Sequence, residues 1–234
     1  MSIAQEVLRH LNEFNRKERF YVVGMALGKP HFGLDEEFRQ NLGYELRVSI
    51  PSDAFAAMDY HLDWIYASLV LYESADAGGI YPSCNKITAT QEDIDLLIAY
   101  QEGEDCHIIL VEAKGDSAFS NKQLKDKSLR LKQNFGSEGR KWTTVIPHFV
   151  LMSPYRPTNR LKRDKWPKWM HPDGKFKWIE LQLPGQLKKV TVCDEEGKRE
   201  GDGQHWMVER VPARGSIPTH RDDGGCRGIP PTLY

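Results

Sequence analysis

The sequence predicts an α/β fold in which helices cover a central sheet, and two observations predict it. Apolar runs at 94–100 and 107–113 flank a polar, glycine-containing segment at 101–106, which is the pattern of a β-hairpin. Both runs are apolar on both faces, as is normal for strands covered on both sides. Amphipathic patterns at 54–73 and 120–134 supply the covering helices.

The segment 1–53 is expected to be an α/β elaboration that precedes the core. Apolar residues recur at helical intervals in 2–15, and a second helix is expected from 34 to 42. Compact apolar runs at 20–27 and 44–50 are expected to be strands. We interpret this region as scaffold or as an element of substrate specificity.

The core is expected to span residues 54–152. Its predicted elements are a helix at 54–73, a strand within 80–88, the two hairpin strands, a helix at 120–134 and a strand at 144–152. Residues 153–211 should form a basic, aromatic loop and a C-terminal hairpin packed on the core. The Gly- and Pro-rich segment 212–234 is expected to be an extended tail.

Composition bounds the class of protein. The chain has 234 residues, of which 40% are hydrophobic, enough for a buried core. No apolar run approaches the ~20 residues that cross a bilayer, and the start lacks the apolar block of a signal peptide, so we expect a cytoplasmic protein without a membrane partner. Cys84, Cys106, Cys193 and Cys226 never adopt a Cys-x-x-Cys spacing, which favours reduced structural thiols.

Charge is distributed unevenly along the chain, although the net charge is only -1. Residues 1–113 contain 8 basic and 19 acidic side chains, whereas residues 114–189 contain 18 and 6. The remaining residues, 190–234, contain 6 basic and 8 acidic side chains. Such asymmetry predicts that the basic segment meets a polyanion while another segment supplies acidic groups.

Charged side chains converge at one end of the predicted hairpin. With the turn centred at 103–104, Asp95 lies opposite Glu112, and alternation puts Asp93 and Lys114 on the same face. Two adjacent carboxylates need a neutralising partner. A hard divalent cation such as Mg²⁺ would be one. The alternative is a salt-bridged sheet end without chemistry.

Asp95, a hairpin, and then Glu112-Ala113-Lys114 at the end of an apolar strand together resemble the motif of the PD-(D/E)xK nuclease superfamily. The resemblance covers roughly residues 54–152. It implies a restriction-endonuclease-like core that runs helix, three strands, helix and strand around a mixed central sheet.

Two details bear on this resemblance. Gln123 opens the second helix of the core, where many members carry a glutamine. Ile94 stands where many members have proline, and no aromatic residue follows Gln123 at the spacing of some subfamilies. No subfamily is therefore assigned.

The resemblance implies a metal-dependent nuclease that hydrolyses phosphodiester bonds; DNA is favoured as the substrate, although the residues themselves do not tell DNA from RNA. Asp95 and Glu112, with the carbonyl of Ala113 as a further ligand, would bind Mg²⁺ or Mn²⁺. Lys114 would position the attacking water or help to deprotonate it, while the metal neutralises charge on the phosphate. Gln123 would orient the substrate.

Helical residues extend the candidate site. Lys127 would join Gln123 in orienting the substrate. A carboxylate on the first core helix often completes the metal site in this superfamily, which makes Asp63 a candidate, with Asp59 and Glu73 as alternatives. For each of these acids taken individually, a solvated helix face is the favoured interpretation.

Basic and aromatic residues downstream of the motif predict contacts with nucleic acid. Cations would track phosphates and aromatic rings would stack on bases. The candidates are Lys122, Lys125, Lys127, Arg130, Lys165, Trp166, Lys168 and Trp169. The alternatives are a solvated helix face and tryptophans that anchor a long loop.

Two other functions remain open at this stage. The chain could be a catalytically inactive module that keeps the nuclease fold and binds nucleic acid or protein, or it could be purely structural. The residues do not choose between single and double strands, between exo and endo cleavage, or between a monomer and a homodimer.

Overall fold

In a computed structural model the chain forms two compact units, residues 1–182 and 183–234. The structure describes residues 2–28, 32–71, 79–81, 86–87, 92–157, 161–184 and 187–210.

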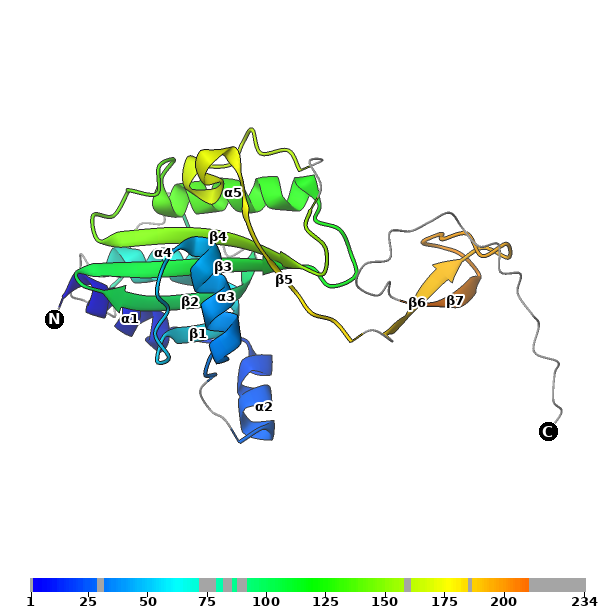
Figure 1. Ribbon diagram of the computed structural model, residues 1–234, viewed down its shortest axis with the longest axis horizontal. Helices are drawn as coiled ribbons and strands as arrows, with labels where there is room; N and C mark the ends of the chain where they lie inside the picture. The colour runs from blue at the N-terminus through cyan, green and yellow to red at the C-terminus, as the bar shows by residue number, and fades with distance from the viewer. Residues whose placement is uncertain are drawn as a thin grey trace. The chain divides into compact units, whose positions relative to one another are not determined.

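The first unit is built on a five-stranded mixed sheet with helices on both faces, which confirms the predicted α/β class (Figure 1). Across the sheet lie β1 (Phe55–His61), β2 (Asp93–Glu102), β3 (Asp105–Ala113), β4 (Val145–Ser153) and β5 (Lys177–Glu180). The first three strands pair antiparallel, and β3, β4 and β5 pair parallel.

Five α-helices and two short 3₁₀ helices accompany these strands in the described part of the first unit. They are α1 (Ile3–Glu13), α2 (Glu18–Ala26), α3 (Glu36–Leu46), α4 (Leu62–Leu71), α5 (Asn121–Phe135), η1 (Lys168–Met170) and η2 (Pro172–Gly174). Among the described residues no helix is both long enough and apolar enough to cross a membrane.

The hairpin register follows the sequence prediction. Leu96 pairs with Val111 and Glu102 with Asp105. Gly103 takes a positive φ of 61° in the turn, a conformation that glycine adopts without a steric cost. Asp95 and Glu112 therefore follow directly on the last described ladder pair.

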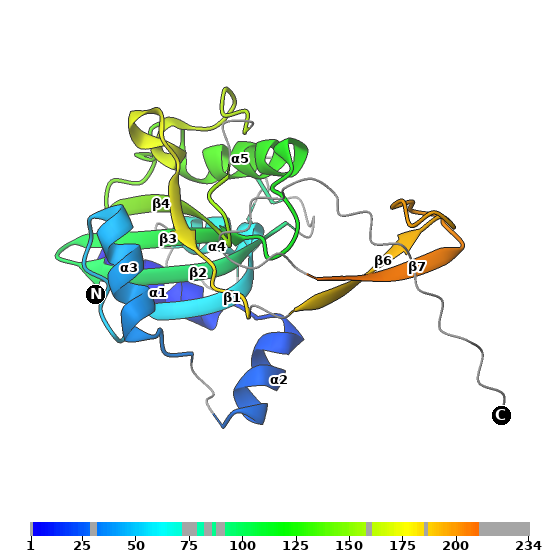
Figure 2. The ribbon, with the colours of Figure 1, turned by 45° about the vertical axis from the view of Figure 1, so that its right-hand side comes forward.

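Two apolar clusters fill the two faces of the sheet. One lies beneath α1, α4 and α5, and the other beneath α3. Figure 2 shows α3 in front of the sheet and α1 behind it. Along β3, Ile108 and Leu110 belong to the first cluster and Ile109 to the second, as side-chain alternation requires. By the same alternation, Glu112 points to the α5 side.

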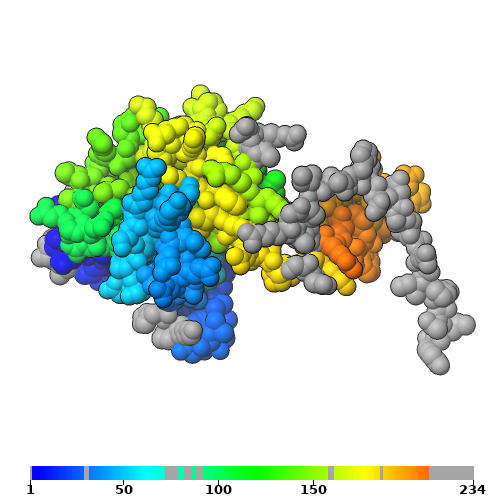
Figure 3. Space-filling view, in the orientation of Figure 1, coloured from blue at the N-terminus to red at the C-terminus, as the bar shows by residue number. Residues whose placement is uncertain are grey.

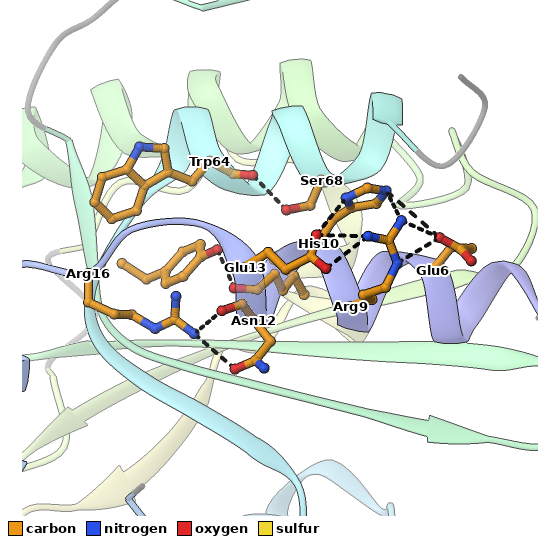
Figure 4. Close-up of polar contacts among 10 residues, drawn as sticks. Glu6, Arg9, His10, Asn12, Glu13, Arg16, Trp64 and Ser68 are labelled. Atoms are coloured by element: carbon orange, nitrogen blue, oxygen red, sulfur yellow. Dashed lines mark hydrogen bonds and ion pairs between the residues drawn. The ribbon is translucent and has the colours of Figure 1, made fainter. Parts of the chain in front are cut away.

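Helix α3 also packs beside β5, and Figure 3 shows these two elements next to each other on one face of the first unit. On the opposite face α1 packs against α4. Figure 4 shows the polar residues of this region: Arg9 lies between Glu6 and Glu13, and Arg16 donates to the carbonyl of Asn12. These bonds keep the charged groups of α1 satisfied while its apolar side packs on the sheet.

The prediction of one helix over 54–73 is wrong in its first half. Residues 55–61 form β1, in which Met58 pairs with Leu96 and Tyr60 with Ile94. The helix α4 begins only at Leu62. Helical spacing of apolar residues was present, but pairing with β2 satisfies the backbone of this segment and takes precedence over local pattern.

The two strands predicted before the core are also wrong. Residues 20–27 lie mostly in α2, in which Phe20 and Gly24 form the buried side. Residues 44–50 contain the end of α3, which stops at Arg47 with a left-handed φ of 61°. A short apolar run has no period that separates helix from strand, so composition alone misassigned both.

The other predicted elements have mixed outcomes. Helices at 2–15, 34–42 and 120–134 and the strand at 144–152 are confirmed as α1, α3, α5 and β4. Residues 80–81 and 86–87 have no strand conformation, and the rest of 80–88 lies outside the described residues. The sheet gains β5, so the first unit continues past the predicted core end at residue 152.

The second unit contains the predicted C-terminal hairpin, formed by β6 (Lys188–Cys193) and β7 (His205–Arg210). Its packing on the core stays a prediction. The predicted tail at 212–234 lies outside the described residues. Cys106 is a buried free thiol, in keeping with the expectation for the cysteines. Cys193 is also buried, and Cys84 and Cys226 are not described.

Candidate functional site

The candidate site lies at the end of β2 and β3 that is remote from the hairpin turn. One oxygen of Asp95 accepts a hydrogen bond of 2.6 Å from the backbone N–H of Ala113. This bond fixes Asp95 against the strand that carries Glu112. The predicted convergence of Asp95, Glu112 and Lys114 is therefore present.

Glu112 is the centre of this cluster and is only 1% exposed. Its Oε2 accepts from the ammonium group of Lys127 on α5, with which it forms an ion pair. Its Oε1 has two longer contacts, 3.3 Å to Nζ of Lys114 and 3.4 Å to Nε2 of Gln123. Gln123 thus lies where the sequence placed it, at the start of α5 beside the acid.

Lys127 has a different environment from the predicted one. The sequence assigned it to the substrate, but its side chain is buried and donates to Glu112 and, at 2.6 Å, to the carbonyl of Asp93. The spacing of apolar residues along α5 could have indicated that Lys127 is buried. Lys127 stands three residues after Leu124 and four before Leu131, which places it on the apolar face of α5.

Burial is the main influence on the pKa of the Glu112 carboxyl. Removal from water raises the pKa of the Glu112 carboxyl above its ordinary value. The neighbouring ammonium group of Lys127 opposes this rise, whereas the negative charge of Asp95 adds to it. Asp95 has this effect because the two carboxylates lie close together where little water screens their charges.

The N-terminal region contributes a residue that sequence analysis missed. Lys17, which precedes α2, forms an ion pair with one oxygen of Asp93. The other carboxylate oxygen of Asp93 is buried and has no hydrogen-bond partner among the described residues. No local pattern connects Lys17 with an acid 76 positions along the chain.

Asp63 does not join the cluster. It forms a buried ion pair with Arg130, which ties α4 to α5. Within the described part of the chain, no three acidic, histidine or cysteine side chains are grouped as a metal site would require. Asp59 pairs with Arg19, and Glu73 lies outside the described residues.

The basic loop predicted after β4 runs along α5 (Figure 1). Near the start of the helix, the N–H of Lys162 donates to the Asn121 side chain at 2.8 Å. Just after the end of the helix, the backbone N–H of Lys168 donates to the carbonyl of Ser137 at 3.0 Å. The indole N–H of Trp169 donates to the carbonyl of Gly136 at 3.1 Å. Exposed cations from both segments therefore lie along one helix: Lys122, Lys125, Lys165 and Lys168.

Other residues assigned to nucleic acid are buried. Arg130 belongs to the ion pair with Asp63, and Trp166 is 5% exposed and packs edge-on against Phe149. Trp169 is partly buried against Phe135. In this conformation Trp166 has no open face for a base, so the anchoring role left open by the sequence is the one its packing matches.

Two carboxylates at the site are oxygen donors of the kind that a hard divalent cation takes. Mg²⁺ is commonly held by one or two carboxylates while water and phosphate complete its shell. Asp95 and Glu112 are those two carboxylates, and among the described residues the contacts of Glu112 Oε1 are the two long ones. The carbonyl of Ala113 follows directly on Glu112 and could supply a further oxygen.

Comparisons with models of known protein families, with curated proteins and with solved structures find no match to this chain. Its function is therefore inferred from its residues and their geometry.

Proposed function

We propose that the chain is a metal-dependent nuclease that hydrolyses phosphodiester bonds, with DNA as the favoured substrate. The observation that carries the proposal is the meeting of Asp95, Glu112, Lys114 and Gln123 at one end of the β2–β3 pair. Two acids, an ammonium group and an amide in one place are a suitable set for binding a cation and a phosphate.

The order of elements supports the same proposal. Helices precede β1, and β1, β2 and β3 are followed by α5 and then by β4, parallel to β3. This order resembles the helix, three strands, helix, strand order of the PD-(D/E)xK core, but α4 is inserted between the first two strands. The segments differ from those assigned by sequence, because β1 replaces the expected helix.

The residues would divide the chemistry among them. Asp95, Glu112 and the carbonyl of Ala113 would hold Mg²⁺ or Mn²⁺, which when bound supplies positive charge to the phosphate and acidifies water. The ammonium group of Lys114 would orient the attacking water and stabilise charge on the phosphate. The water oxygen would form a bond to phosphorus as the ester P–O bond breaks; the water would lose a proton to bulk solvent, and the departing oxygen would take up a proton from it. Gln123 would donate its amide hydrogen to a phosphate oxygen.

The basic loop and α5 would hold the remainder of the substrate. A helix of 15 residues extends roughly 22 Å, which is several phosphate spacings of a nucleic acid. Exposed lysines distributed along that length favour a polyanion over a small phosphate ester. Because they are exposed, their contribution should fall steeply with salt.

The test is cleavage of single-stranded, duplex and supercoiled DNA with Mg²⁺ or Mn²⁺. Asp95→Ala and Lys114→Ala should each abolish cleavage. Matched controls are Glu104→Ala, at the other end of the same hairpin, and Lys198→Ala, in the second unit; both should cleave normally. Cleavage that survives Asp95→Ala and Lys114→Ala would rule out this site.

One observation favours a second candidate, a nucleic-acid-binding module without catalysis. Lys127 and Lys17 neutralise Glu112 and Asp93 within the protein itself. A cation is then not needed merely to balance charge. Calorimetric titration with Mn²⁺ separates the two: the nuclease binds the ion and Asp95→Ala removes the binding, whereas the module binds DNA but no metal ion.

A further inference from the structure

We propose that Lys127 is a positioning residue, which holds Oε2 of Glu112 so that Oε1 is presented to a divalent cation. The inference rests on the proposed nuclease function and assigns a role within its metal site. Sequence analysis had instead placed Lys127 among the residues that contact the substrate.

The two oxygens of Glu112 lie in different surroundings. Oε2 contacts the buried ammonium group of Lys127, which is 5% exposed. Oε1 contacts Lys114, which is partly exposed, and Gln123, which is exposed, both at more than 3.2 Å. Glu112 itself is buried, but Oε1 faces the more exposed partners and its present contacts are the longer ones.

The ammonium group of Lys127 is also held by a second hydrogen-bond partner. Its ammonium group donates to the Asp93 carbonyl as well as to Glu112, so it links β2, β3 and α5. The helix itself is anchored to α4, because the side chain of Asn134 donates to the carbonyl of Leu62 at 3.1 Å. A lysine held in this way loses little further freedom when it orients a carboxylate.

A different role for Lys127 would have the opposite consequences. If it were a counter-ion that the metal displaces, it would compete with the cation for Glu112. Removal of its charge would then tighten metal binding. If it positions Glu112, its removal frees the carboxylate to rotate and weakens metal binding.

Calorimetric titration with Mn²⁺, without substrate, distinguishes the two roles. Lys127→Met should bind Mn²⁺ about 10–100-fold more weakly than the unsubstituted protein, the usual cost of losing a residue that orients a metal ligand. Lys127→Gln, which can still donate to Glu112, should lose less. Lys132→Met, at an exposed position of the same helix, should bind as the unsubstituted protein does. Tighter or unchanged binding by Lys127→Met overturns the proposal.

The outcomes also separate this inference from the proposed function. If the unsubstituted protein binds no Mn²⁺, both are overturned. If Asp95→Ala abolishes binding while Lys127→Met leaves it unchanged, only the positioning role is overturned.

Chemical labelling of the unsubstituted protein tests the proposal even if the substitutions at Lys127 prevent folding. With an amine-reactive reagent and mass spectrometry, Lys127 should stay unlabelled both without Mn²⁺ and at saturation. Lys125 should be labelled in both conditions. A Lys127 that becomes reactive when Mn²⁺ binds has been displaced, which overturns the positioning role.

Discussion

Lys127 on α5 and Glu112 on β3 form an ion pair in which both side chains are buried. The pair joins a helix to a strand at the candidate site. Because both groups are buried, too little water surrounds either charge to replace its partner. Loss of one partner should therefore lower the free energy of unfolding.

We expect Lys127→Met to lower the free energy of unfolding by about 3 kcal/mol, because it removes the buried counter-ion of the Glu112 carboxylate and leaves the longer contact with Lys114 at 3.3 Å. Urea denaturation measures the change. The control Lys125→Met should lie within about 0.5 kcal/mol of the unsubstituted protein. The double variant Glu112→Gln, Lys127→Met should recover part of the loss, and no recovery would contradict the pairing.

Asp63→Asn should separate stability from metal binding. It removes the charge that pairs with Arg130, so a loss of about 3 kcal/mol in the free energy of unfolding is expected. Mn²⁺ affinity should not change, since Asp63 does not group with Asp95 and Glu112. A large loss of Mn²⁺ affinity in a folded Asp63→Asn protein would return this residue to the metal site.

Lys165→Ala and Lys168→Ala should weaken DNA binding without affecting the fold. Both side chains are exposed on the loop beside α5. Each phosphate contact that is lost should reduce the slope of log affinity against log salt by about 1. Fluorescence anisotropy at several salt concentrations measures the slope. An unchanged slope in the double variant would place DNA elsewhere.

Trp166→Ala should act through stability instead. The ring belongs to the core cluster beneath α5, and its removal should cost about 3–5 kcal/mol. Thermal unfolding followed by circular dichroism checks this. A stable Trp166→Ala protein with weakened DNA binding would instead support base stacking.

The free energy of unfolding should fall at acid pH because of His148. Burial, together with the adjacent His107, lowers the pKa of His148 to about 4 in the folded protein. The unfolded chain, with a histidine pKa near its ordinary 6.5, binds more protons between these values. This contribution is therefore complete above pH 6.5 and is lost as pH falls towards 4, by about 3 kcal/mol.

Urea denaturation between pH 7 and pH 4 tests this dependence. His148→Gln should flatten the acid limb, whereas His205→Gln, at an exposed position of the second unit, should leave it intact. An acid limb of the same slope in His148→Gln would assign the loss of stability to other groups.

Local pattern alone determined the parts of the fold whose forces are local. The β2–β3 register follows from alternation on either side of a turn that glycine favours, so Asp95, Glu112 and Lys114 could be brought together from sequence. Helix α5 was predictable in the same way. Ser120 caps it, and Leu124 and Leu131 mark its buried face.

Tertiary structure decided what depends on partners far along the chain. Residues 55–61 become a strand because β2 offers them a ladder, although their apolar spacing suits a helix. Lys127 becomes the partner of Glu112, and Lys17 that of Asp93, because packing of α5 and of the N-terminal region brings these charges out of water together. A periodic pattern specifies which face of a helix or strand is buried, but not which residues of other elements that face contacts. The free-energy cost of burying a charged side chain depends on the residue with which it pairs, so the sequence pattern alone does not determine it.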